Sequence, residues 1–209
     1  MTMIARPGLA SLDEIPLSTF NQRRLEEAST DMQGVAPWRD RKKSEARQLL
    51  ALEQLAGSSR MRVMSLDIDQ DLRAAVWLDV PVAMTPAPDG SLKVARGAVI
   101  GIVYPQVILT MPLPGFALVC LVNPSSGVYY PNVGTSRGQR MCLGASLPVG
   151  IPVSELVLLS YGLLTGQTIM MDTADSAGVM HVAAAHYWSA NRDKMPLSST
   201  PFLQPDPAT

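Results

Sequence analysis

The stretch from Val94 to Tyr104, VARGAVIGIVY, decides the fold of this chain. Its β-branched residues and strand-like apolar pattern predict a β-strand. Three further stretches share this character and lie at residues 61–65, 75–82 and 116–122. Clusters of Pro, Gly and Asp separate the stretches and predict turns. Four consecutive strands joined by short turns indicate an antiparallel meander rather than a parallel sheet.

Helical periodicity flanks this predicted sheet on both sides. Apolar residues recur at helical spacing from Asp40, a plausible N-cap, until Gly57 ends the run. Further helices are expected from Ser18 or Thr19 to about Met32, where Gly34 and Pro37 break the pattern, from Val153 to Thr165 and from Ser176 to Lys194. The predicted fold class is therefore α+β, with a four-stranded antiparallel meander sheet flanked by an N-terminal helix and C-terminal helices.

The chain length indicates one domain with extensions. Its 209 residues exceed the size of a typical domain, about 100 to 150 residues. We expect an N-terminal extension with a short helix over residues 1–39, a single domain over 40–196 and a flexible tail over 197–209. Residues 1–17 show little periodicity, so we predict no regular structure there.

Composition excludes several functional classes. Charged residues make up 17% of the chain and the formal net charge is -1, so we expect no nucleic-acid partner. The most apolar region, residues 98–122, is interrupted by Pro, Gln and Gly, which predicts no membrane span. No secretory signal is visible at the start. Two cysteines without a Cys-x-x-Cys pair predict a reducing, cytoplasmic location, no metal and no cofactor.

The segment from Asn123 to Val149 is rich in Gly, Ser, Pro and Asn, and long ordered loops of this kind tend to be functional. It contains Cys142 among several glycines, which let another chain approach the sulfur closely. Arg137 and Arg140 lie nearby in sequence and are candidates for lowering the thiol pKa. The alternative is a cysteine that is simply buried and inert.

Asn132 and Cys120 need separate interpretations. The side-chain amide of Asn132 can donate hydrogen bonds to a developing oxyanion, and such a donor lowers the activation barrier by about 3 kcal/mol. Its alternative role is an Asx turn after Pro131. Cys120 lies in the apolar stretch FALVCLV, residues 116–122, so we predict that it is a core residue without chemical function.

A series of short motifs runs through the chain, formed by Tyr104-Pro105, Tyr130-Pro131-Asn132-Val133, Gly138, Cys142-Leu143, Pro152, residues 155–164 (ELVLLSYGLL) and residues 184–194. In this order they resemble the core of ubiquitin-conjugating enzymes, in which a His-Pro-Asn motif precedes a catalytic Cys-Leu. Together they cover roughly Asp40 to Met195. The chain departs from the family in having Tyr130 in place of the usual His, and Gly150 near the place of a familiar Trp.

The resemblance implies a UBC-like fold and a defined chemistry. Cys142 maps to the cysteine that accepts a ubiquitin-like modifier from an activating enzyme as a thioester, before transfer to an amine of a protein target. Asn132 maps to the asparagine that supports the transition state. Arg41, Lys42 and Lys43 map to the basic face that helps to dock the activating enzyme, although such a face is most often simply solvated. The divergence resembles the prokaryotic branch, members of which occur in operons linked to phage defence.

Two other functions stay open at this point. A non-catalytic member of the same fold would act as a binding scaffold, but such relatives typically lack the cysteine. A cysteine hydrolase would need a histidine within hydrogen-bond reach of Cys142. The chain has only His181 and His186, both in the last predicted helix, where structural or surface roles are expected.

Overall fold

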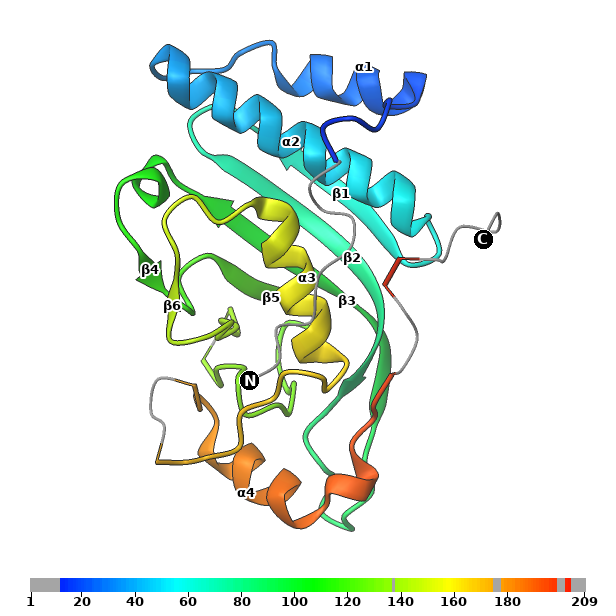
Figure 1. Ribbon diagram of the computed structural model, residues 1–209. Coiled ribbons are helices and arrows are strands. Elements are labelled where there is room, and N and C mark those ends of the chain that lie inside the picture. The colour runs from blue at the N-terminus through cyan, green and yellow to red at the C-terminus, as the bar shows by residue number, and fades with distance from the viewer. Residues whose placement is uncertain (1–11, 137, 175–177, 199–201, 204–209) are drawn as a thin grey trace.

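A computed structural model describes residues 12–136, 138–174, 178–198 and 202–203. Its main sheet has four strands in the order β1-β2-β3-β5, and every neighbouring pair is antiparallel. The strands are β1 (Met61–Asp67), β2 (Leu72–Ala83), β3 (Val94–Tyr104) and β5 (Val119–Asn123). The predicted α+β class and the antiparallel meander are therefore confirmed (Figure 1).

The pair β2 and β3 forms the centre of the sheet. Buried residues alternate with more exposed ones along β2 and over residues 98–104 of β3, as expected where one face packs on a core. Pro81 lies inside β2, where the register with β3 shifts between Leu78 and Pro81. Such an irregularity tolerates a residue that cannot donate a ladder hydrogen bond. Gly97 opposes this shift with φ +82, and a Cβ there would lie 2.7 Å from the indole nitrogen of Trp77.

The fourth strand differs from its prediction. It begins at Val119 rather than at Phe116, because residues 115–118 form a turn in which Ala117 N donates to Pro114 O at 2.9 Å. A second, two-stranded sheet was not predicted from the sequence. It pairs β4 (Leu113–Pro114) with β6 (Ser146–Leu147), so the end of the long loop is held to the segment that precedes β5.

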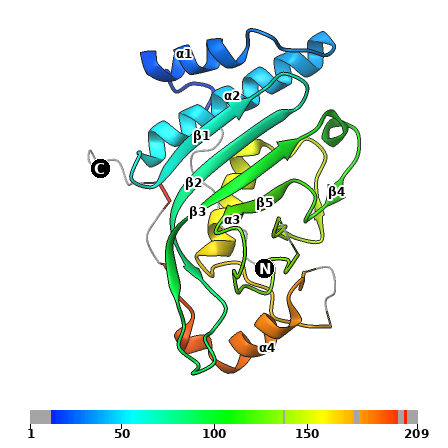
Figure 2. The same cartoon turned by 180° about the vertical axis from the view of Figure 1, so that it is seen from behind.

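The described residues form four α-helices, of which the second and third make extensive contact with the sheet. They are α1 (Thr19–Ala28), α2 (Ala36–Ala56), α3 (Val153–Leu164) and α4 (Val182–Ala190), with short 3-10 helices at Gln106–Leu109 and Arg192–Lys194. α2 contacts β1 and α3, and α3 lies over β2. Figure 2 shows the opposite face of the sheet, which no helix of the described residues covers.

Several predicted helix boundaries were wrong. α2 begins at Ala36 instead of Asp40, because Pro37 lies in its first turn, where a missing N–H has no cost. α1 ends at Ala28 rather than at Met32. The helix expected from Ser176 to Lys194 is α4 followed by a 3-10 turn, and Ser176 itself lies outside the described residues. The ends predicted at Gly57 and Gly166 are confirmed, with φ values of +77 and +78.

The N-terminal segment from Leu12 to Ser18 contains turns but no helix or strand, as predicted for this part of the chain, and it is attached to α2. Leu12 is 2% exposed within the core. The Arg47 guanidinium donates to Leu12 O at 2.8 Å and to Ile15 O at 2.7 Å. Gln54 donates to Pro16 O at 3.1 Å and accepts from Ser18 N at 3.0 Å. The polar face of α2 therefore binds backbone rather than solvent along this segment.

The start of α3 is held by a carboxylate from α2. Glu45, whose side chain is 2% exposed, accepts from Val153 N at 2.6 Å and pairs with Arg41 at 2.6 Å. Arg41 also donates to Gly150 O at 2.8 Å, and Tyr104 OH donates to Ile151 O at 2.8 Å. The N-cap residue of α3 is Pro152, which makes no side-chain cap, so Glu45 supplies the acceptor that the helix end requires. Burial raises the Glu45 pKa, against the lowering effects of the Val153 N–H and of Arg41.

We expect Glu45→Ala to lower the free energy of unfolding by about 3 kcal/mol, because it leaves the Arg41 charge and the Val153 N–H without their acceptor. Urea unfolding followed by circular dichroism measures this. Glu27→Ala is the control, since Glu27 and Arg23 form an exposed pair on α1 and a change within about 0.5 kcal/mol is expected there. Equal losses for the two variants would contradict the assigned role of Glu45.

Candidate functional site

A short hairpin brings Asn132 and Cys142 together. Cys142 N donates to Asn132 O at 2.8 Å, and Val133 pairs with Met141 in an antiparallel bridge. Gly134 N donates to Arg140 O at 2.8 Å and Gln139 N to Ser136 O at 3.0 Å, which close the turn. The two residues that the sequence singled out as a pair are therefore neighbours across this hairpin.

Cys142 lines a partly open cavity of about 250 Å³. The residue is 2% exposed, and Sγ donates to Gly144 O at 3.3 Å. The wall of the cavity comes from the hairpin, from α3 and from the segment after α3. Its residues are Asn132, Cys142, Leu143, Gly144, Leu159, Leu163, Thr168, Met170 and Gly178. The open approach to the sulfur expected from the glycine-rich sequence is not present, because Met170 and Gly178 complete the wall.

Gly115 fixes the backbone beside the thiol. Leu143 N donates to Gly115 O at 3.1 Å, and a Cβ built on Gly115 would lie 1.6 Å from Gly144 O. Any side chain at residue 115 would therefore displace the carbonyl that accepts from Cys142 Sγ. This requirement for glycine cannot be read from the sequence, because it depends on a contact between segments about thirty residues apart.

The amide of Asn132 binds two residues that line the cavity, Met170 and Gly178. Its Oδ1 accepts from Met170 N at 3.1 Å and its Nδ2 donates to Gly178 O at 2.8 Å. Met180 N and His181 N both donate to Pro131 O, at 2.8 Å and 2.9 Å. The alternative role of Asn132, an Asx turn, is not formed, since its side chain bonds to Met170 N and Gly178 O. The amide can donate a hydrogen bond to an oxyanion only through its second N–H, or after Met170 and Gly178 have moved away from it.

Tyr130 is the residue that the resemblance aligns with a histidine of the family. Its hydroxyl is buried, donates toward Leu164 O at 3.1 Å and Pro81 O at 3.2 Å, and accepts from Ala83 N at 3.4 Å. It thus links the end of β2 to the end of α3. Burial raises the pKa of Tyr130 to about 12.

The basic residues expected on a solvated face of α2 are mostly structural. Lys42 is 0% exposed, and its ammonium donates to Gln33 O at 2.9 Å, to Gln70 O at 3.1 Å and to Asp69 O. Burial lowers the Lys42 pKa. Arg41 is committed to Glu45 and Gly150, so of the predicted docking residues Lys43 alone is exposed. The prediction of a basic docking face was wrong for Lys42, because helical spacing does not reveal which carbonyls a neighbouring turn presents.

The other sequence candidates lie away from this cavity. Cys120 is half-buried on the face of the sheet opposite α3, with Sγ 3.7 Å from Gly101 O, so its assignment to the core was wrong. Arg140 is exposed, and Arg137 lies outside the described residues. His181 packs against the Tyr129 ring at 4.9 Å, and burial lowers its pKa. Neither His181 nor the exposed His186 lines the cavity at Cys142, as the hydrolase alternative would require.

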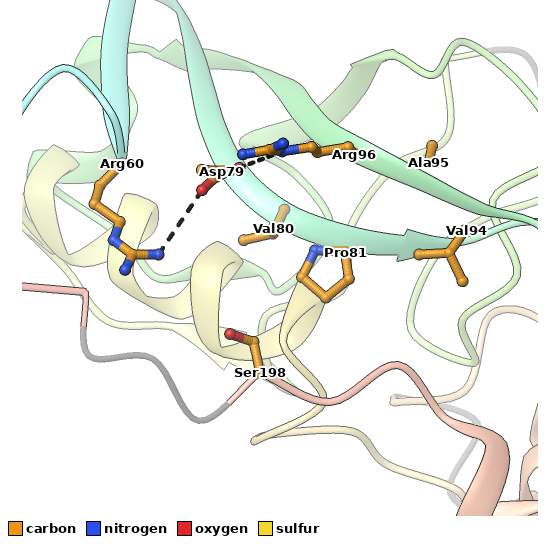
Figure 3. Close-up of a pocket in the computed structure, with 8 residues that line it drawn as sticks. All are labelled: Arg60, Asp79, Val80, Pro81, Val94, Ala95, Arg96 and Ser198. Atoms are coloured by element: carbon orange, nitrogen blue, oxygen red, sulfur yellow. Dashed lines mark ion pairs between the residues drawn. The ribbon is translucent and has the colours of Figure 1, made fainter.

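A larger cavity of about 350 Å³ lies beside the irregular part of β2 (Figure 3). Asp79 lies between Arg60 and Arg96, with ion-pair distances of 3.8 Å and 3.6 Å. The rest of the cavity wall is formed by Val80, Pro81, Val94, Ala95 and Ser198. This cavity contains neither cysteine nor histidine among its described residues, so we place the candidate functional site at Cys142.

Comparisons with protein-family models, with curated proteins and with solved structures found no match to this chain. Within the described residues, no helix has both the length and the apolar character needed to cross a membrane. In the same part of the chain, no group of three or more His, Cys, Asp or Glu side chains could hold a metal ion.

We expect Gly115→Ala to expose Cys142, because the added methyl displaces the Gly144 carbonyl beside it. In a Cys120→Ala background, the rate of Cys142 alkylation by iodoacetamide should rise at least tenfold, measured by mass spectrometry. Gly90→Ala is the control: its φ of +78 makes alanine strained there, but nothing lies within 4 Å of the new methyl. An unchanged alkylation rate in Gly115→Ala would show that the contact does not fix the thiol.

We expect the contribution of Tyr130 to stability to disappear in alkali. Its pKa is about 12 in the fold against 10.0 ordinarily, so the unfolded chain loses the phenolic proton first as the pH rises. The contribution is therefore complete below pH 10.0 and is lost as the pH rises through about 12. Urea unfolding of wild type and Tyr130→Phe at pH 8 and pH 11.5 measures the difference, which should shrink at the higher pH by on the order of 2 kcal/mol. A difference that is independent of pH would contradict this role.

Proposed function

We propose that this protein is a ubiquitin-like-protein conjugating enzyme with a UBC-like fold. It accepts a ubiquitin-like modifier from an activating enzyme as a thioester on Cys142 and passes it to an amine of a protein target. The observation that carries the proposal is the hairpin that places Cys142 directly across from Asn132, with both lining one cavity. The order of helix, meander sheet, cysteine loop and helix is also the order that the resemblance implies.

The chemistry requires two acyl transfers at one sulfur. The Cys142 thiolate attacks the thioester carbonyl of the incoming modifier, and the cysteine of the activating enzyme leaves as a thiolate. A target amine then attacks the new thioester and the Cys142 thiolate leaves. A lysine amine has an ordinary pKa of about 10.4, so the second step needs an acceptor for its proton. Since neither histidine lines the cavity, a thioester on Cys142 has no resident base beside it among the described residues.

Access to the sulfur is the structural requirement of this proposal. Cys142 is 2% exposed, so the wall formed by Met170 and Gly178 has to separate from Asn132 before a macromolecular thioester can reach it. The hydrogen bonds from the Asn132 amide to this segment would break in that step. The freed amide could then donate to the oxyanion of the tetrahedral intermediate. By resemblance to the prokaryotic branch, we propose a cytoplasmic role in antiphage defence.

A non-catalytic scaffold is the second candidate. The burial of Cys142 and the engagement of both amide atoms of Asn132 favour it, because a docking module needs neither group to be accessible. A reactive thiol and a structural one predict different outcomes in the same assay.

Thioester formation separates the two candidates. The protein is mixed with an activating enzyme, a ubiquitin-like modifier and ATP, and the products are resolved without and with a thiol reductant. We expect an adduct that the reductant removes, that is absent in Cys142→Ala and that resists the reductant in Cys142→Ser, because an ester is not cleaved by thiols. Cys120→Ala is the matched control and should retain the adduct. An adduct that persists in Cys142→Ala and is lost in Cys120→Ala would overturn the assignment.

A further inference from the structure

The cavity at Cys142 has the properties of a small-molecule site, apart from any role of the sulfur. Its side chains are largely aliphatic, contributed by Leu143, Leu159, Leu163 and Met170. The volume of about 250 Å³ exceeds that of a cavity of about 150 Å³ which, when lined by apolar side chains, stays dry and binds benzene. The space is therefore large enough for a compact organic molecule.

Two of the three polar side chains in the wall, those of Asn132 and Cys142, are engaged within the protein, and the third is the hydroxyl of Thr168. The Asn132 amide bonds to Met170 N and Gly178 O, and Cys142 Sγ donates to Gly144 O. A buried water molecule needs about two to four polar partners, and the side chains of the wall leave two for it, the second N–H of the Asn132 amide and the Thr168 hydroxyl. Water inside such a space is poorly bound, so an apolar occupant gains free energy by replacing it.

We propose that this cavity binds a small neutral apolar molecule in contact with the Cys142 thiol. The occupant lies between α3 and the Asn132 hairpin, held by dispersion and the hydrophobic effect rather than by directional bonds. A charged ligand is disfavoured, because the wall has no ionised side chain to pair with it. An occupant also covers the sulfur, so the same site gives a means of blocking Cys142.

Benzene is the probe for this site, and methyl NMR of methionine-labelled protein is the readout. Met170 lines the cavity, whereas Met111 is 50% exposed and serves as the internal reference. We expect a benzene titration to shift the Met170 methyl resonance in a saturable manner and to leave Met111 with a small linear change. A Met170 shift that is linear and no larger than that of Met111 would overturn the proposal.

Two neighbouring leucines of α3 provide matched variants. Leu159 lines the cavity and Leu158 does not, yet both are half-buried against the core. Leu159→Phe should fill the space and weaken benzene binding at least tenfold, while Leu158→Phe should change it by less than twofold. Equal effects of the two substitutions would contradict the assigned location.

Protection of the thiol gives a second measurement that needs only the Cys120→Ala background. Benzene should slow alkylation of Cys142 by iodoacetamide at least threefold, with a dependence on benzene concentration that matches the NMR titration. An unchanged rate at saturating benzene would overturn the contact with the sulfur. None of these experiments uses an activating enzyme or a modifier, so benzene binding and thioester formation can succeed or fail independently.

Discussion

The buried carboxylate of Glu45 is the interaction on which the arrangement of this protein depends. It joins α2 to the first N–H of α3, and Arg41 extends the connection to the turn before that helix. α3 in turn presents Leu159 and Leu163 to the cavity at Cys142. A single acidic side chain, placed by one helix, therefore sets the position of the helix that forms one wall of the candidate site. Burial works against its charge, and the two partners are what make the charged form tolerable.

Much of the framework could be predicted from the sequence because local patterns specify it. The β-branched stretches predicted the meander. The apolar run that begins at Val153 predicted α3, and Gly166 predicted where this helix ends. The pairing of Asn132 with Cys142 was also foreseen, although from a family resemblance rather than from geometry. These features need little information about distant parts of the chain.

The predictions that failed concern contacts between distant segments. Lys42 has the periodicity of a surface residue, but carbonyls from residues 33, 69 and 70 surround its ammonium. Cys120 belongs to an apolar strand, yet the sheet register places it on the face that no described helix covers. The burial of Cys142 depends on a segment almost thirty residues later. The spacing of apolar residues along the sequence predicts which face of a helix or strand a side chain lies on. Its surroundings depend on which distant segments pack against that face.

The attachment of residues 12–18 to α2 places different evolutionary constraints on the segment and on the helix. Arg47 and Gln54 bind main-chain carbonyls, which every amino acid possesses. The exposed positions of the segment are thus free to drift in identity without loosening its hold. Arg47 has no such latitude: its planar fork spans two carbonyls, Leu12 O and Ile15 O, and the single ammonium of a lysine lacks that geometry.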